Sequence, residues 1–237
     1  MTVWRLETFD ELASTSDVCT MRARAGEADG LVVLALRQTA GRGSRGRSWQ
    51  SPEGNLNLSV LLRPARPAVQ AGLFALLAGV VIAESLQSFS LPPVNLKWPN
   101  DVLIDGAKLA GVLIDAAPVE SRLDWLVIGI GVNLRHAPEV FGRRTTSLAA
   151  HGVQLLPQEM ADAISKRFSC WQDAPDEDIH AAWLARAHPI GTKLEISTGH
   201  TQISGYFAGL SARGELLLQR ENRIDVISTG EVLLGQV

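Results

Sequence analysis

The first half of the chain alternates between short apolar runs and polar turns, a pattern that predicts β-strands. Residues 31–36 are apolar throughout, as expected of a strand that is buried on both faces. Residues 55–62 instead carry a large apolar side chain at every second position, which is the period of a strand. The alternating side chains are those of Leu56, Leu58, Val60 and Leu62.

A strand and a helix are predicted before these two strands. Residues 2–9 read as a short strand, and Ser14 and Asp17 have the spacing of a capping box that starts a helix. Gly26 is placed to end this helix. On these residues alone, Ser14 and Thr15 need be no more than helix caps.

An uncharged stretch over residues 67–83 predicts an apolar helix of roughly residues 67–88. Arg66 and Glu84 bound the uncharged stretch, which is at the short limit for a membrane span. It also lies between two predicted strands of one sheet. We therefore interpret it as a helix buried in the core of a folded domain.

Asp105 and Gly106 lie between two apolar runs and predict a β-hairpin with a two-residue loop. In that register Leu103 lies opposite Lys108. Directly opposed residues of a hairpin share a face, so Lys108 and Asp101 are expected to project from the same face. A strand over residues 123–134 then pairs antiparallel with 108–115. Such a meander argues against a doubly wound parallel sheet.

Two helices and a group of short strands are predicted in the rest of the chain. One helix starts at Pro157, and a second starts at Asp176 and stops at Pro189. From Ile190 onward, short strand candidates separated by glycines predict a small β-barrel over residues 190–237. Its length is near the lower limit for independent folding, so we expect it to pack against the larger domain.

Composition and charge narrow the possible functions. The 237 residues are 46% hydrophobic and suffice for one large domain, or one domain with a small appendage. The net charge of −3 gives no general attraction to nucleic acids or anionic membranes. Cys19 and Cys170 are isolated in the sequence, which favours a reducing cytoplasm. The N-terminus has no pattern of a secretion signal.

Candidate chemistry is concentrated in the stretch Gly41-Arg42-Gly43-Ser44-Arg45-Gly46-Arg47-Ser48-Trp49, which follows the apolar strand. Its glycines let main-chain N–H groups approach a ligand closely. Its three arginines supply forked donors that suit carboxylates and phosphates. A solvated basic loop is the ordinary alternative, but the density of glycine and arginine between two apolar strands favours a loop that binds an anionic ligand.

The glycines of this loop match the dinucleotide pattern G-x-G-x-x-G, but the context of that pattern is missing. Pro52 and Gly54 break any helix directly after the loop. No Asp or Glu lies between Glu53 and Glu84, where the acidic residue of a dinucleotide fold would be expected. The loop also lacks the G-K-[ST] ending of a P-loop.

Further polar residues flank the later apolar strands. Each has an ordinary structural explanation as a solvated lysine, a turn residue or a cap, but their number indicates a site. His180 and His188 are not joined by other His or Cys residues, so no protein-bound metal site is predicted. The flanking polar residues are Lys97, Asn100, Asp101, Lys108 and Asn133.

Four ordered motifs resemble the biotin protein ligases, which join biotin to a lysine of carboxylase carrier domains. The resemblance covers essentially the whole chain. The motifs are Gln38-Thr-Ala-Gly-Arg-Gly-Ser-Arg-Gly-Arg-Ser-Trp49, Lys97-Trp-Pro-Asn-Asp101, Lys108-Leu-Ala-Gly111 and Gly129-Ile-Gly-Val-Asn133.

The resemblance implies an α+β fold. It would comprise a catalytic domain related to class II aminoacyl-tRNA synthetases over residues 1–189, with a mixed or antiparallel sheet, and an SH3-like barrel over residues 190–237. It also implies two reactions. Biotin and ATP with Mg²⁺ would give biotinyl-5′-AMP, and the biotinyl group would then pass to a carrier lysine of acetyl-CoA carboxylase or a related enzyme.

The resemblance also implies roles for single residues. The catalytic residues would be Lys108, Arg42, Lys97 and Asp101. The biotin-binding residues would be Ser14, Thr15, Ser16, Gln38, Gly41, Arg42, Gly43, Ser44, Lys108 and Gly111. The nucleotide-binding residues would be Arg45, Arg47, Trp49, Asn100 and Asn133.

Two positions depart from the family pattern. Many members have Arg where this chain has Ser44, which implies weaker retention of the adenylate unless Arg45 or Arg47 replaces the missing cation. Many relatives have Asn at Ser16. Some members also carry an N-terminal DNA-binding winged helix. This chain starts directly at the catalytic domain, so neither a repressor role nor nucleic-acid binding is expected.

Two other functions compete with this interpretation. A lipoate or octanoate protein ligase would share the fold and the adenylation chemistry, and a non-catalytic biotin-binding module would share the loop. The lysine and aspartate motifs favour a biotin ligase. The expected partner is a biotin carboxyl carrier domain, the expected location is the cytoplasm, and no membrane association is expected. The chain would be a monomer or a homodimer.

Overall fold

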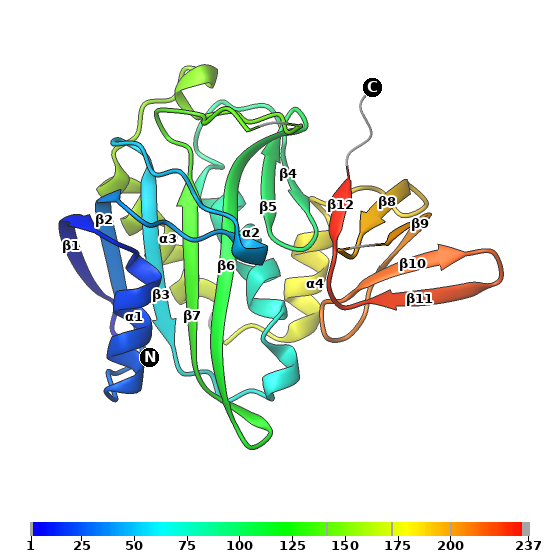
Figure 1. The fold of residues 1–237 in the computed structure, drawn as a ribbon, viewed down its shortest axis with the longest axis horizontal. Helices are drawn as coiled ribbons and strands as arrows, with labels where there is room; N and C mark the ends of the chain where they lie inside the picture. The colour runs from blue at the N-terminus through cyan, green and yellow to red at the C-terminus, as the bar shows by residue number, and fades with distance from the viewer. Residues whose placement is uncertain (1, 141, 172, 200, 234–237) are drawn as a thin grey trace.

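Seven strands form one mixed sheet in the computed structural model, which describes residues 2–140, 142–171, 173–199 and 201–233. The strand order is β1-β2-β3-β7-β6-β5-β4 (Figure 1). Strands β1 and β2 are parallel, and every other neighbouring pair is antiparallel. The predicted mixed sheet is confirmed. The strands are β1 (Arg5–Leu12), β2 (Leu31–Gln38), β3 (Leu56–Leu62), β4 (Val94–Lys97), β5 (Asp101–Ile104), β6 (Ala107–Val119) and β7 (Arg122–Val132).

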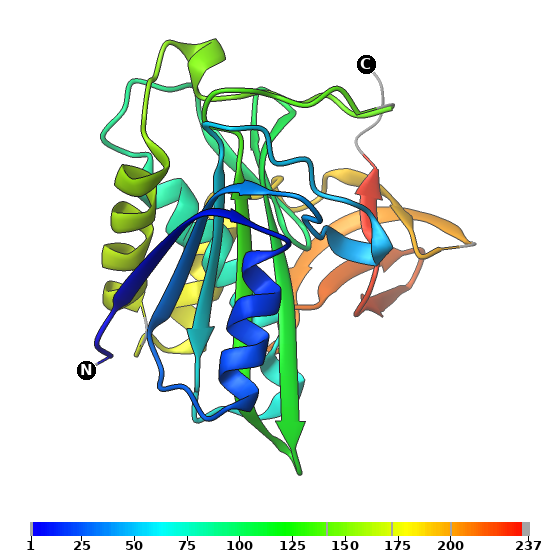
Figure 2. The ribbon, with the colours of Figure 1, turned by 60° about the vertical axis from the view of Figure 1, so that its left-hand side comes forward.

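Helices cover both faces of this sheet (Figure 2). Helix α1 (Thr15–Arg24) packs against β2, β3 and β7 on one face. Helices α2 (Leu73–Ser85) and α3 (Pro157–Trp171) lie on the other, and α4 (Asp176–Leu184) packs against α2. Successive residues of β2 alternate between the two cores, which explains why the whole strand is apolar. Short 3-10 turns occupy Ser44–Gly46, Ala68–Gln70 and Ala149–His151.

The apolar helix predicted after β3 is a core helix, as expected. A 3-10 turn comes first, so α2 begins at Leu73 rather than at residue 67. Residues 73–83 are all buried between the sheet and the neighbouring helices α3 and α4. The segment Ala68–Ser85 has the length and composition of a membrane span, but most of it is buried inside the protein.

The start of α1 differs from the prediction. Ser14 is the N-cap residue, but its side chain makes no capping hydrogen bond, so the proposed capping box is wrong. The main-chain N–H of Thr15 instead donates to Oε1 of Gln38, at 2.8 Å. A side chain from β2 thus caps the helix, because the end of β2 lies beside the first turn of α1. Strand β1 also begins at Arg5, later than predicted.

The predicted hairpin between β5 and β6 is confirmed. Ile104 lies opposite Ala107 and Leu103 lies opposite Lys108. The register then shifts, because Val102 pairs with Ala110 and leaves one extra residue on β6. This β-bulge changes which side chains of β6 share a face.

The end of the chain forms a second, five-stranded antiparallel sheet in the order β11-β10-β9-β8-β12. Its buried side chains, such as Phe207 and Val232, belong to the same apolar core as the main sheet. Helix α4 ends at Leu184, before the predicted stop at Pro189, and the boundary at residue 190 stays a prediction. The strands are β8 (Lys193–Ser197), β9 (Gln202–Leu210), β10 (Leu216–Arg220), β11 (Arg223–Ile227) and β12 (Glu231–Leu233), of which β12 was not predicted.

Candidate active site

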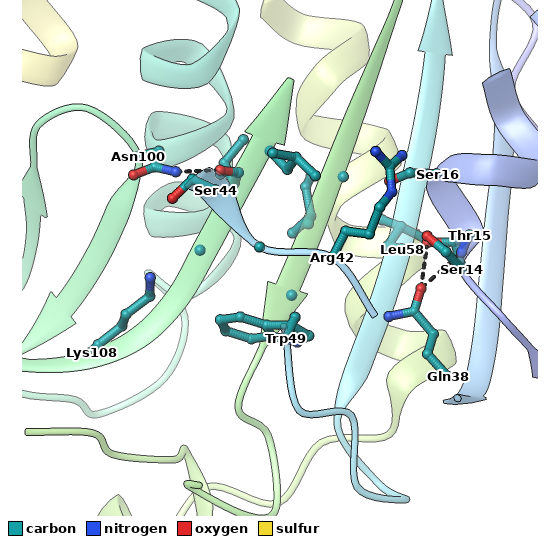
Figure 3. Close-up of a pocket in the computed structure, with 17 residues that line it drawn as sticks. Ser14, Thr15, Ser16, Gln38, Arg42, Ser44, Trp49, Leu58, Asn100 and Lys108 are labelled. Carbon is teal, nitrogen blue, oxygen red and sulfur yellow. Dashed lines mark hydrogen bonds between the residues drawn. The ribbon is translucent and has the colours of Figure 1, made fainter. Parts of the chain in front are cut away.

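A pocket lies over the middle of the main sheet, between the start of α1 and strands β6 and β7 (Figure 3). The Gly-Arg loop over residues 41–49 passes along it, so residues from four separate motifs meet there. The predicted site residues that line the pocket are Ser14, Thr15, Ser16, Gln38, Arg42, Gly43, Ser44, Trp49, Asn100, Lys108 and Gly111.

One end of the pocket is a buried polar corner. The Thr15 hydroxyl lies 3.2 Å from Oε1 of Gln38 and 2.8 Å from the Ser59 hydroxyl. The Ser16 hydroxyl is 3.1 Å from the same Ser59 oxygen. These hydroxyls and the Gln38 amide are held in one network, which presents fixed donors and acceptors to a ligand.

Ser59 was missed in the sequence. It is fully buried, like the other residues of β3, so the alternation of that strand does not mark a solvent face. The polar positions of β3 instead face α1 and Gln38, because Ser59 bonds to the Thr15 and Ser16 hydroxyls and Asn57 accepts from the Gln38 amide. The sequence did contain a signal, because Asn57 and Ser59 alternate with the large apolar residues of this strand.

Two lysines and a carboxylate form a buried ion-pair group behind the pocket. Lys97 Nζ lies 2.9 Å from Oδ2 of Asp101, and Lys108 Nζ donates to Oδ1 of the same carboxylate. The predicted common face of Lys108 and Asp101 is thus confirmed. Burial by itself would raise the pKa of Asp101, but the Lys108 and Lys97 ammonium groups outweigh this effect and hold the pKa below its usual value. Asp101 therefore stays ionised and fixes both lysines.

Lys108 is the member of this group that reaches the pocket. Its ammonium lies 5.6 Å from the centre of the Trp49 ring, a cation–π contact. The indole in turn lies directly over β7, where a Cβ added to Gly131 would overlap the ring atoms. Only glycine leaves room for the ring at that position. The indole N–H of Trp49 is buried and has no hydrogen-bond partner among the residues that the structure describes.

The three arginines of the loop point in two directions. Arg42 lines the pocket and pairs with Asp115 of β6 at 2.6 Å and with Asp17 of α1 at 3.1 Å. Arg45 and Arg47 instead point to the second sheet, where both contact the carboxylate of Glu231. Asp17, Asp115 and Glu231 were not predicted as partners of these arginines, because they lie far from the loop in the sequence.

Several predicted site residues lie beside the pocket rather than on its surface. The Gly41 carbonyl accepts a hydrogen bond from the main-chain N–H of Trp49 at 2.9 Å and closes the base of the loop. Asn133 is buried behind Lys108 and donates to the carbonyls of Lys108 and Thr146. Asn100, in contrast, does line the pocket, and its side-chain amide donates to the carbonyl of Val112 at 2.5 Å. The nucleotide-binding roles of Asn100 and Asn133 stay predictions.

The arrangement suits chemistry on an anion. Lys108 of β6 lies at one side of the pocket, and Arg42 of the loop lies at the other side, beside the polar corner (Figure 3). Such preorganised donors stabilise negative charge that develops during a reaction. No group of three or more His, Cys, Asp or Glu side chains that could hold a metal occurs among the described residues.

Comparisons with known proteins agree with this geometry. Residues 12–133 match the model of the biotin/lipoate A/B protein ligase family. The chain is 34% identical to the biotin–[acetyl-CoA-carboxylase] ligase of Paracoccus denitrificans over 215 residues, which are 86% of this chain and 90% of that protein. It is 33% identical to the ligase of the same name from Mycobacterium tuberculosis, over 97% of this chain and 89% of that one.

A solved structure gives the same result for the fold. The biotin protein ligase from Aquifex aeolicus, in complex with biotin and ATP, superposes with a TM-score of 0.77 at 29% identity. The match covers 96% of this chain and 97% of the other. The α+β fold with a second sheet at the C-terminus is therefore that of a known ligase. The chain belongs to the biotin protein ligases of the biotin/lipoate A/B protein ligase family.

Proposed function

We propose that this chain activates biotin with ATP and transfers the biotinyl group to a lysine of a carboxyl carrier domain, as a biotin–[acetyl-CoA-carboxylase] ligase. The observation that carries the proposal is the convergence of Lys108, Arg42 and the polar corner at Gln38 on one pocket. The corner suits the uncharged polar ring of biotin, and the cations suit its carboxylate and the phosphates of ATP.

In the first step, a carboxylate oxygen of biotin attacks the α-phosphorus of ATP. The bond between the α-phosphorus and the bridging oxygen breaks, and pyrophosphate leaves with that oxygen. Lys108 and Arg42 would neutralise the charge that gathers on the carboxylate and the α-phosphate in the transition state. Asp101 would act through Lys108, since its carboxylate holds the ammonium in place.

In the second step, the amine of the carrier lysine attacks the carbonyl carbon of biotinyl-5′-AMP. An amide bond forms, the bond from the carbonyl carbon to the AMP oxygen breaks, and the lysine nitrogen loses a proton. Closure of the Gly-Arg loop would place the reactants and exclude water that could hydrolyse the mixed anhydride. Ser44, which lines the pocket within this loop, is the position where retention of the adenylate would be weakest.

Mg²⁺ would accompany ATP. This ion commonly keeps several water ligands and binds through one or two carboxylates and the substrate phosphates. When bound, it would neutralise part of the polyphosphate charge.

The expected setting follows from the same proposal. Two free cysteines, one buried and one exposed, fit a reducing cytoplasm. The partner would be a carrier domain that presents one lysine at the mouth of the pocket. Both a monomer and a homodimer are compatible with this activity, and a role in nucleic-acid binding is not part of the proposal.

The test is biotin-dependent exchange of labelled pyrophosphate into ATP in the presence of Mg²⁺, with octanoate and lipoate in parallel reactions. Exchange with biotin alone is the expected result. Exchange with octanoate or lipoate alone would assign the chain to the lipoate branch of the family instead. No exchange with any of the acids, from folded protein, would favour a non-catalytic biotin-binding module.

A further inference from the structure

Strand β12 of the second sheet touches the catalytic domain at the motif that carries Lys97 and Asp101. Its Val232 carbonyl accepts a hydrogen bond from Lys97 Nζ at 3.2 Å. Trp98 of the same motif donates from its indole N–H to the carbonyl of Gly214, at 3.0 Å. The second sheet is therefore fixed against the site by two buried hydrogen bonds, one to β12 and one to the turn between β9 and β10.

Glu231, the residue before Val232, forms ion pairs with three arginines. Glu231 Oε2 lies 3.1 Å from Arg47 and 3.7 Å from Arg45, and Oε1 pairs with Arg143. The Glu231 side chain is only 17% exposed, so water shields these ion pairs incompletely. Two of the arginines come from the Gly-Arg loop, and the third comes from the segment between β7 and α3.

One carboxylate cannot neutralise three guanidinium groups. The cluster keeps an excess of positive charge, and each guanidinium has five N–H donors, of which the carboxylate uses a fraction. The Arg47 side chain is further fixed by bonds to the carbonyl and the hydroxyl of Ser44. N–H donors that are held in place but have no acceptor form a preorganised site for a second anion that carries more charge than a carboxylate.

The position of this cluster indicates which anion it would take. Ser44, Arg45, Arg47, Asn100, Asp101 and Glu231 line one hollow beside the main pocket. Ser44 and Asn100 also line the main pocket, so the two hollows are adjacent. A ligand that reacts in the main pocket could extend a negatively charged tail into the hollow.

We propose that Glu231 is a positioning residue of the ligase, which holds Arg45, Arg47 and Arg143 together as a cradle for the polyphosphate of ATP. This inference rests on the function proposed above. Without the carboxylate, the three guanidinium groups would repel one another and the Gly-Arg loop would detach from the second sheet. The second sheet would then be a part of the nucleotide site.

The experiment compares Glu231→Gln and Glu231→Asp in the full chain with a matched control, Glu195→Gln, on the exposed face of neighbouring strand β8. Trypsin cleavage after Arg45 and Arg47 reports loop release without any need for activity. We expect Glu231→Gln to raise this cleavage about tenfold over wild type, since cleavage follows the population of the open loop. The cleavage rate of Glu231→Asp should lie nearer to that of wild type, and the cleavage rate of Glu195→Gln should equal that of wild type.

Pyrophosphate exchange on the same proteins gives the second measurement. We expect Glu231→Gln to raise the KM for ATP about tenfold, with the kcat and the KM for biotin within about twofold of wild type. The role of Glu231 would be overturned if Glu231→Gln left both the cleavage rate and the KM for ATP unchanged. It would also be overturned if Glu195→Gln had an equal effect, or if Glu231→Asp did not restore either value toward wild type. No exchange in any protein, wild type included, would overturn the proposed function instead. The two failures can be told apart, because trypsin cleavage measures the attachment of the loop to Glu231 without any need for activity.

Discussion

Lys108 and Gly111 project from the same face of β6 although they lie three positions apart. A Cβ added to Gly111 would lie 3.0 Å from Lys108 Nζ. In a regular strand residues with this spacing point to opposite faces. The extra residue of the β-bulge at Leu109 reverses the alternation and brings both positions to the pocket. Glycine at position 111 leaves the space through which the Lys108 ammonium reaches the site.

Gly111→Ala should therefore displace the Lys108 ammonium without unfolding the protein. The new methyl group would press on the end of the Lys108 side chain and on the Trp49 ring rather than on main-chain atoms. A misplacement of about 1 Å can lower a rate about a hundredfold. We expect biotin-dependent exchange to fall by about tenfold to a hundredfold, with little change in the melting temperature. Gly72→Ala is the matched control, because a Cβ there meets only an ordinary contact at 3.8 Å. Full activity of Gly111→Ala would contradict this placement of Lys108.

Lys108→Ala should remove a cation from the transition state of adenylation. Loss of one such group typically lowers a rate by about 10² to 10³. The fold should survive, because Lys97 still pairs with Asp101. Pyrophosphate exchange measures the rate, and circular dichroism confirms folding. Lys193→Ala, on the exposed face of β8, controls for the loss of a lysine. Wild-type exchange in Lys108→Ala would refute a catalytic role for this residue.

Ser44→Arg should retain the adenylate for longer. A guanidinium at this position of the pocket would add a hydrogen bond to an anionic phosphate, worth about 1.5 to 3 kcal/mol. We expect the release of biotinyl-5′-AMP into solution to slow about tenfold, measured by rapid gel filtration of enzyme loaded with labelled biotin. Ser48→Arg introduces the same charge at a position of the loop outside this pocket. Equal release rates in Ser44→Arg and wild type would show that the serine does not limit retention.

The free energy of unfolding should depend on the ionisation of Asp101 in acid, below the usual pKa of a carboxyl group. The pKa of this buried carboxyl is held below its usual value of 3.8, so its stabilising effect is complete above that value and is lost as the pH falls below it. In Asp101→Asn, the two lysines have no counter-ion, at a cost of about 3 to 5 kcal/mol near pH 7. Urea unfolding at pH 7 and at about pH 2.5 should show that the difference in the free energy of unfolding between wild type and variant narrows in acid. A constant difference would contradict the ion-pair interpretation.

Much of the fold was predictable because its signals are local. The alternation of residues 55–62, the two-residue turn at Asp105 and Gly106 and the uncharged run before Glu84 each determine one element and its neighbours along the chain. The two-residue turn also fixes the register of the hairpin, and this register places Lys108 and Asp101 on one face. The Gly-Arg loop was recognisable by its composition, because glycine and arginine are concentrated there between two apolar strands.

The partners of those residues depend on segments far apart in the sequence. The sequence by itself determined most of the strands, the core helix and the motifs whose residues meet at the pocket, since periodicity and turn residues act over a few positions. Only the tertiary structure decided that Gln38 caps α1, that Ser59 bonds to the Thr15 and Ser16 hydroxyls, that a bulge turns Gly111 toward Lys108, and that Glu231 contacts three arginines. These contacts arise from the packing of α1, β6 and the second sheet against one core, and no local pattern encodes that packing.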